Sequence, residues 1–108
     1  MEAAARIDPL DALGNPQRRA IVEILGEQPR SVGEIADALP ISRPAVSRHL
    51  RLLSEAGLVA GEQLGARRLY RLEGAGVDIV RRYLEAVWGD AASRFRVFAD
   101  STRPGQSD

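Results

Sequence analysis

The segment SVGEIADALPISRPAVSRHLRLLSEAG, residues 31–57, decides the fold, because it contains two helical patterns separated by a very short turn. Ser31 and Glu34 have the spacing of a capping box, which predicts the start of the first helix, and Pro40 predicts its end. Ser42, two positions later, is the cap residue of the second helix. Two short helices joined by a tight, capped turn are typical of a helix-turn-helix, which we predict for this segment.

The second helix of this pair, expected from Arg43 to about Ala56, has one apolar face and one polar face. At about 100° per residue, aliphatic side chains gather on one side, and hydroxyl and guanidinium groups gather on the other. The polar face consists of Pro44, Ser47, Arg48, Arg51 and Glu55. Such a helix can enter the major groove of DNA with its N-terminus first, where arginine binds guanine or phosphate. The alternative is that Arg48 and Arg51 only solvate the surface.

Two further helices are expected before this segment. Asp8-Pro9 and Asn15-Pro16 each combine a cap residue with a first-turn proline. These pairs predict a short helix near residues 9–13 and a second helix that stops near Gly26.

After Gly57 the period of the apolar residues changes, and two strands should surround a turn that contains Gly65. We expect the strands over residues 58–61 and 68–72, a break at Gly74 and Gly76, a last helix over 77–99 and a disordered polar tail over 101–108. The predicted fold is mainly α with a small β-hairpin, in one domain over residues 1–100.

Composition limits the classes of function. The 108 residues have room for one domain, and they include no cysteine, which excludes disulfides and thiolate chemistry. No stretch approaches the roughly 20 apolar residues that cross a bilayer, and residues 1–7 lack the apolar run of a signal peptide, so we expect a cytoplasmic protein without a membrane partner. We also find no glycine-rich phosphate loop, metal-ligand cluster or nucleophile with a suitable base, and therefore expect no enzyme, cofactor or metal.

The net charge of zero conceals one basic region. Residues 42–72 contain six arginines and two acids, and we expect Arg67 and Arg68 to crowd the hairpin turn with no acid nearby. Two separate basic elements beside one surface favour DNA contact over a plain solvated surface. His49 borders the apolar face of its helix, where a lone histidine is more often packed and hydrogen-bonded, although a phosphate contact stays open.

The last helix carries four of the five aromatic residues of the chain: Tyr83, Trp88, Phe95 and Phe98. A small domain can cover only part of that surface, so we expect two copies of the chain to share it. The alternative is an ordinary core helix with its aromatic side chains inside the protomer. Gly89 and Asp90 weaken the helix and are candidates for a kink.

Four stretches of the sequence together resemble the ArsR/SmtB family of bacterial winged helix-turn-helix transcriptional regulators. They are LGNPQRR at 13–19, AVSRHLRLL at 45–53, AGLV at 56–59 and RRLYRL at 67–72. The resemblance covers roughly residues 8–99. It implies a winged helix-turn-helix fold, with the helix-turn-helix at 31–57, the wing at 58–72 and a dimerisation helix at 77–99.

The resemblance further implies a homodimer that binds double-stranded DNA at an inverted repeat and regulates transcription. We expect repression, of its own promoter included, and leave activation open. Carried over position by position, the DNA contacts are Ser42, Arg43, Pro44, Ser47, Arg48, His49, Arg51, Arg67 and Arg68. The implied dimer interface consists of Leu10, Leu13, Tyr83, Leu84, Val87, Trp88, Ala91, Phe95 and Phe98. A winged helix that binds only other proteins is the alternative function.

Founding members of this family sense metals or arsenite. Their sites use cysteines on the DNA-binding helices, or Asp, His and Glu on the last helix, whereas this chain has no cysteine and one histidine. The chain therefore resembles the cysteine-free branch of the family, whose members include autorepressors, and its sequence indicates no inducer.

Overall fold

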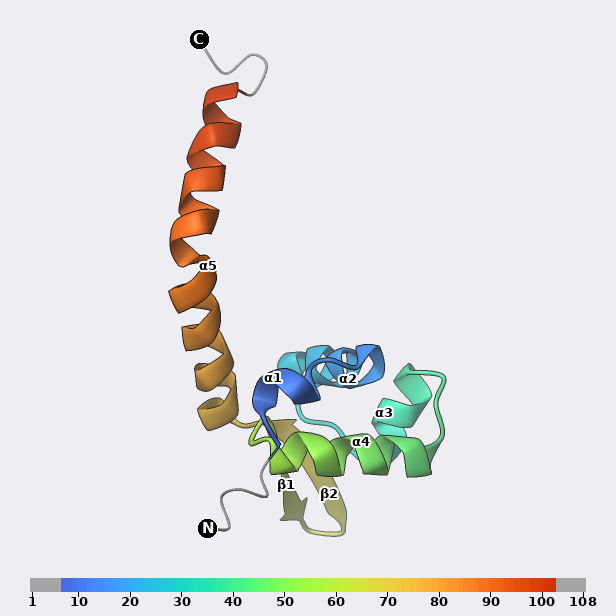
Figure 1. Cartoon of the computed structure of the whole chain (residues 1–108). Helices are drawn as coiled ribbons and strands as arrows, with labels where there is room; N and C mark the ends of the chain where they lie inside the picture. The colour runs from blue at the N-terminus through green and yellow to red at the C-terminus, as the bar shows by residue number, and fades with distance from the viewer. Residues whose placement is uncertain (1–6, 103–108) are drawn as a thin grey trace.

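The computed structural model describes residues 7–102, apart from the side chains of residues 92, 93 and 95–102. The elements follow the predicted order and form a helical body, a two-stranded wing and one long helix that leaves the body (Figure 1). They are α1 (Pro9–Ala12), α2 (Pro16–Glu27), α3 (Val32–Ala38), α4 (Arg43–Glu55), β1 (Val59–Leu64), β2 (Arg67–Leu72) and α5 (Gly74–Thr102).

The first two helices begin where the cap residues and prolines predict. The Asp8 carboxylate accepts a hydrogen bond from the Leu10 N–H at 2.8 Å, and Asn15 Oδ1 accepts one from the Arg18 N–H at 3.0 Å. Each cap thereby satisfies an N–H group that has no partner within its helix. Arg18 Nε donates to the Ala12 carbonyl at 2.7 Å and so joins the end of α1 to the start of α2.

Helices α3 and α4 form the predicted helix-turn-helix, and their first turns are capped by the predicted residues. The Ser31 N–H donates to Glu34 Oε1 at 2.9 Å, and the Glu34 N–H donates to Ser31 Oγ at 3.2 Å. Ser42 Oγ accepts from the Ala45 N–H at 3.2 Å. Local capping therefore determines where both helices begin and how short the turn between them is.

The hydrophobic core fixes the orientation of α4 relative to the rest of the body. Its largest fully buried side chains are aliphatic: Ile21, Ile35, Val46, Leu50, Leu53 and Leu58. They come from α2, α3, α4 and the residue before β1. Because three of the six belong to α4, this helix is held along most of its length by the body.

The wing is an antiparallel pair of β1 and β2 whose turn contains Gly65, with a φ of +65°. Both strands are longer than predicted. Their register runs from Val59↔Leu72 to Leu64↔Arg67. On its other edge, β2 pairs with the loop between α2 and α3 through two hydrogen bonds between the backbones of Arg30 and Tyr70, at 3.0 and 2.8 Å. The wing is thus attached to the entry of the helix-turn-helix.

Gly74 and Gly76 begin α5, so the prediction that they interrupt the chain before the last helix is wrong. The Gly76 N–H donates to the Gly57 carbonyl at 3.0 Å, and a Cβ on Gly76 would lie 2.1 Å from that oxygen. Gly57 has a φ of +77°, in the left-handed region that favours glycine. Close approach of two backbone segments therefore explains the glycine at position 76.

Helix α5 has 29 residues and extends beyond the body of the protein (Figure 1). It is continuous through Gly89 and Asp90, and it includes Ser101 and Thr102, which sequence analysis placed in the tail. Residues 103–108 of that predicted tail lie outside the described residues. In the part of the chain that the structure describes, no helix is both long enough and apolar enough to span a bilayer.

Candidate nucleic-acid interface

Helix α4 separates an apolar face from a basic face, as predicted. Val46, Leu50 and Leu53 are buried in the core, whereas Ser47, Arg48 and Arg51 are exposed. Because the buried face is packed against the body, the exposed face is presented to solvent in a fixed orientation. Polar side chains on a well-anchored helix are what recognition in a major groove requires.

The first turn of α4 contributes three more of the predicted residues. Ser42, Arg43 and Pro44 are all exposed. The Arg43 guanidinium lies against α3, since a Cβ on Gly33 would be 2.9 Å from Arg43 Nη2. The absence of a side chain at Gly33 thus leaves room for the Arg43 head group between the two helices of the helix-turn-helix.

The arginines of this surface have a net positive charge that the described residues do not neutralise. No ion pair among the described residues involves Arg43, Arg48 or Arg51. The positive end of the α4 dipole lies in the same region. An anionic ligand such as a phosphate group is therefore favoured at the start of α4.

His49 is buried and does not belong to this exposed surface, and its predicted contact with DNA stays a prediction. The residue is only 7% exposed, and its Nε2 lies 2.9 Å from Gln17 Oε1 in α2. Burial lowers the pKa of His49, and the positive charges of Arg18 and Arg48 lower it further. The ring is therefore uncharged at neutral pH, and its hydrogen bond with Gln17 joins α4 to α2, which is the packed and hydrogen-bonded role that the sequence favoured.

Gln17 is a residue that sequence analysis missed. It lies four and eight positions before Ile21 and Leu25, the two buried residues of α2, and so shares their helix face. A polar residue in register with a buried stripe is a signal for a buried polar partner. The sequence alone does not indicate that the partner is His49, 32 positions later.

The wing arginines have different surroundings, and one of them corrects the sequence analysis. Arg67 Nη2 lies 3.0 Å from Glu34 Oε2, so Arg67 does have an acid nearby. The Arg68 guanidinium lies 5.5 Å from the centre of the Tyr70 ring, and its Nε donates to the Tyr70 hydroxyl at 3.3 Å. Arg71 pairs with two acids at 3.8 and 3.3 Å. Among the described residues, Arg68 therefore has an aromatic partner and no acidic one.

A second surface of the protein is apolar and lies on α5 and the neighbouring body. Trp88 is 58% exposed, and Tyr83 is also exposed, so the alternative that places these aromatic side chains inside the protomer is wrong for both. Leu84, Val87 and Ala91 are exposed as well, whereas Leu10 and Leu13 are half-buried. Phe95 and Phe98 are also predicted interface residues, but their side chains lie outside the described part of the structure.

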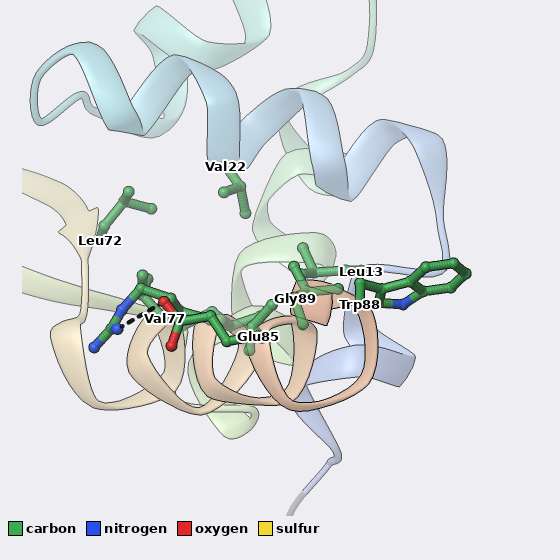
Figure 2. A pocket seen from close by; sticks show the side chains of 11 residues that line it. Leu13, Val22, Leu72, Val77, Glu85, Trp88 and Gly89 are labelled. Atoms are coloured by element: carbon green, nitrogen blue, oxygen red, sulfur yellow. Dashed lines mark hydrogen bonds and ion pairs between the residues drawn. The ribbon is translucent and has the colours of Figure 1, made fainter. Parts of the chain in front are cut away.

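A groove of about 470 Å³ separates α5 from the body and is almost entirely apolar. Figure 2 shows Val22 pointing from α2 toward α5, with Trp88 and Leu13 at one end of the groove. An ion pair between Arg81 and Glu85, 3.4 Å apart, lies at its rim. The described residues contain no group of three or more His, Cys, Asp or Glu side chains that could hold a metal ion.

Comparison with known proteins identifies relatives along nearly the whole chain. Residues 13–62 match the family model described as a helix-turn-helix domain. The chain is 44% identical over 90 residues to the HTH-type transcriptional regulator Rv2034 of Mycobacterium tuberculosis, a match that covers 83% of this chain and 84% of the relative. It is 47% identical over 72 residues to the HTH-type transcriptional repressor SmtB of the same species, over 67% of this chain and 52% of that relative.

Comparison with solved structures also finds transcriptional regulators. A possible transcriptional regulator for arsenical resistance superposes with a TM-score of 0.72 at 36% identity, covering 86% of this chain and 97% of that one. The homodimeric winged helix-turn-helix DNA-binding domain of a possible ArsR-family regulator from Mycobacterium bovis superposes with a TM-score of 0.63 at 28% identity, over 86% of this chain and 84% of that one. From its sequence, its helix-turn-helix and its wing, this chain belongs to the ArsR/SmtB family of winged helix-turn-helix transcriptional regulators.

Proposed function

We propose that this regulator is a cytoplasmic, homodimeric repressor that binds double-stranded DNA at an inverted-repeat operator, its own promoter included. The observation that carries the proposal is the exposed face of α4, where Arg48 and Arg51 have no acidic partner among the described residues. An uncompensated row of guanidinium groups on a helix that the core holds in place suits a polyanion with a readable groove.

The helix and the wing supply different kinds of contact in this proposal. Arg48 and Arg51 reach base edges or phosphates from the exposed face, and Ser47 hydrogen-bonds beside them. The first turn of α4 contacts the DNA backbone through Ser42, Arg43 and Pro44, and the wing approaches the same backbone with Arg67 and Arg68 beside its turn. His49 contributes indirectly, because its bond to Gln17 holds α4 against α2.

Dimerisation supplies affinity that one small basic module lacks. The proposed interface is the apolar surface of α1 and α5 and consists of Leu10, Leu13, Tyr83, Leu84, Val87, Trp88, Ala91, Phe95 and Phe98. Large exposed apolar patches mark interaction sites, and the homodimeric relative from Mycobacterium bovis supports this assignment. Two reading helices about 34–36 Å apart would bind successive turns of one DNA face, so the second contact forms at high effective concentration.

Repression through promoter occlusion is the simplest mode of action for such a dimer, and the relative named as a repressor supports it. We propose no metal effector. The chain has no cysteine, and its one histidine is bound to Gln17 in the body rather than free on α5.

A mobility-shift titration against the DNA upstream of the chain's own gene, at two salt concentrations, tests the proposal. We expect tight binding that weakens steeply with salt, and weaker binding after Arg48→Ala or Arg51→Ala. Arg82→Ala is the matched control, because Arg82 is an exposed arginine of α5 that pairs with Asp78 at 3.3 Å. The protein-binding alternative replaces the proposal if the wild type does not bind this DNA at low salt, or if Arg48→Ala and Arg51→Ala bind it as tightly as the wild type and the control.

A further inference from the structure

The two neighbouring arginines of the wing differ in what neutralises their charge. Arg67 forms an ion pair of 3.0 Å with Glu34, whereas Arg68 lies across Tyr70 and has no acidic partner among the described residues. The sequence treats the two as equivalent basic residues beside one turn. Their surroundings make them candidates for two separate tasks.

Glu34 is itself held firmly and is therefore a suitable anchor for the wing. Its Oε1 accepts the Ser31 N–H at 2.9 Å as part of the capping box, while its Oε2 accepts Arg67 Nη2 at 3.0 Å. The backbone N–H of Ser31 lowers the pKa of Glu34, and Arg67 lowers it further. The carboxylate thus remains charged at neutral pH with both oxygens occupied.

The position of Arg67 in the hairpin makes this contact mechanically relevant. Arg67 pairs with Leu64 in the last register step before the turn, so it belongs to the distal end of the wing. The backbone bonds between Arg30 and Tyr70 attach β2 to the body three residues away. An isolated two-stranded hairpin is only marginally ordered, so a second attachment near its end limits the directions in which it can point.

We propose that Arg67 is a positioning residue, which fixes the wing to the first turn of α3, and that Arg68 is the residue of the wing that binds a DNA phosphate. This division rests on the proposed function, because it assigns roles within the DNA interface. The Arg68 head group makes a cation–π contact with Tyr70 and lies over Gly61, where a Cβ would be 2.8 Å from Arg68 Nη2, so the missing side chain at Gly61 leaves room for it on the wing.

The salt dependence of DNA binding separates the two roles. The logarithm of the affinity falls linearly with the logarithm of the salt concentration, and each lost phosphate contact reduces the magnitude of that slope by about 0.9. Arg68→Ala should therefore lower the slope by about that amount, whereas Arg67→Ala should weaken binding severalfold at every salt concentration with the wild-type slope. A loss of about 0.9 in the slope of Arg67→Ala would overturn the division of roles.

Glu34→Gln gives opposite signs for the two readings of Arg67. Glutamine keeps the capping box and removes the negative charge. A phosphate-binding Arg67 would lose a competing partner, so affinity would rise, whereas a positioning Arg67 would lose its anchor, so affinity would fall severalfold. If Arg67 is a positioning residue, the salt slope of Glu34→Gln should equal that of the matched control Asp37→Asn. Asp37 is an exposed acid of the same helix, and it forms no ion pair among the described residues. The charge swap Glu34→Arg with Arg67→Glu also loses the capping box, because arginine has no acceptor, so it should bind more tightly than Glu34→Arg alone only if the pair acts by holding the wing.

Amide hydrogen exchange tests the same contact without DNA. An exposed ion pair contributes little to global stability, so the expected effect is local. The amides of Arg30 and Tyr70 should exchange severalfold faster in Arg67→Ala and Glu34→Gln, and at the wild-type rate in Arg68→Ala. Wild-type exchange in all three variants would refute the positioning role. If the wild type does not bind DNA but exchange is faster in the first two variants, the proposed function fails and the positioning role stands.

Discussion

Helices α4 and α5 are both amphipathic, but they differ in what covers their apolar faces. In α4, the side chains of Val46, Leu50 and Leu53 are at most 1% exposed, because the body and the base of the wing pack against them. In α5, Val87 is 50% exposed and Trp88 is 58% exposed. Within one protomer, the apolar face of α4 is therefore fully packed, whereas the apolar face of α5 remains exposed.

The largest expected effect comes from placing a charge on the open face of α5. Trp88→Glu would bring a carboxylate into the proposed interface, where burying it without a partner is costly. We expect a folded monomer in light scattering, and operator affinity lower by about 10²–10⁴-fold because the two modules are no longer linked.

Arg82→Glu is the control for that variant, since Arg82 is an exposed arginine of α5 whose partner, Asp78, lies on the same helix. It should remain dimeric. A dimer that persists in Trp88→Glu would remove Trp88 from the interface and would weaken the contrast between the two helices.

The next largest effect is expected on the buried apolar face of α4. Leu50→Ala removes a side chain that is 1% exposed and leaves a cavity, which should lower the free energy of unfolding by about 2–5 kcal/mol in urea titrations. Val87→Ala, on the open face, should change the stability of the monomeric Trp88→Glu background by less than about 0.5 kcal/mol. Equal losses in the two variants would show that both helices are covered alike.

Smaller effects are expected on the exposed face of α4. Arg48→Ala should weaken operator binding by about 1–3 kcal/mol if Arg48 contacts a base, while the free energy of unfolding stays within about 0.5 kcal/mol of the wild type. Mobility shifts and urea titrations of the same preparation measure both quantities. A comparable loss of stability would mean that the face assigned to DNA also supports the fold.

The smallest effect is a pH dependence of the free energy of unfolding, caused by His49 at the edge of the buried face of α4. Because the pKa of His49 is lowered in the folded protein, the unfolded chain binds a proton first, near the ordinary value of 6.5. The contribution of neutral His49 is present above that pH and is lost as the pH falls through it. Urea titrations between pH 7.5 and 5.5 should show this loss in the wild type and a flatter profile in His49→Gln. The same slope in both proteins would contradict a neutral, buried His49.

The starts of the helices could be predicted from the sequence because capping is local. Ser31, Ser42, Asp8 and Asn15 each act within three residues of themselves, and the structure confirms all four caps. The polar and apolar faces of α4 are also local, since they follow from the helical period.

The parts that could not be predicted depend on contacts between distant residues. Glu34 and Arg67 are 33 positions apart, and Gln17 and His49 are 32 apart. Neither pair has a spacing that a helical or strand period could indicate. The start of α5 differs from the prediction for a related reason, because a glycine at position 76 indicates a helix break unless its close approach to Gly57 is known.

Gly57 follows the helix that carries the basic surface, and Gly76 lies in the first turn of the helix that carries the open apolar surface. A hydrogen bond between their main chains joins the two helices, with no room for a side chain between them. In the proposed dimer, the distance between the two copies of α4 therefore depends on this junction, together with the packing of α5 against α1. An effector that tilted α5 there would change which half-site spacings the dimer accepts, without touching any residue that contacts DNA.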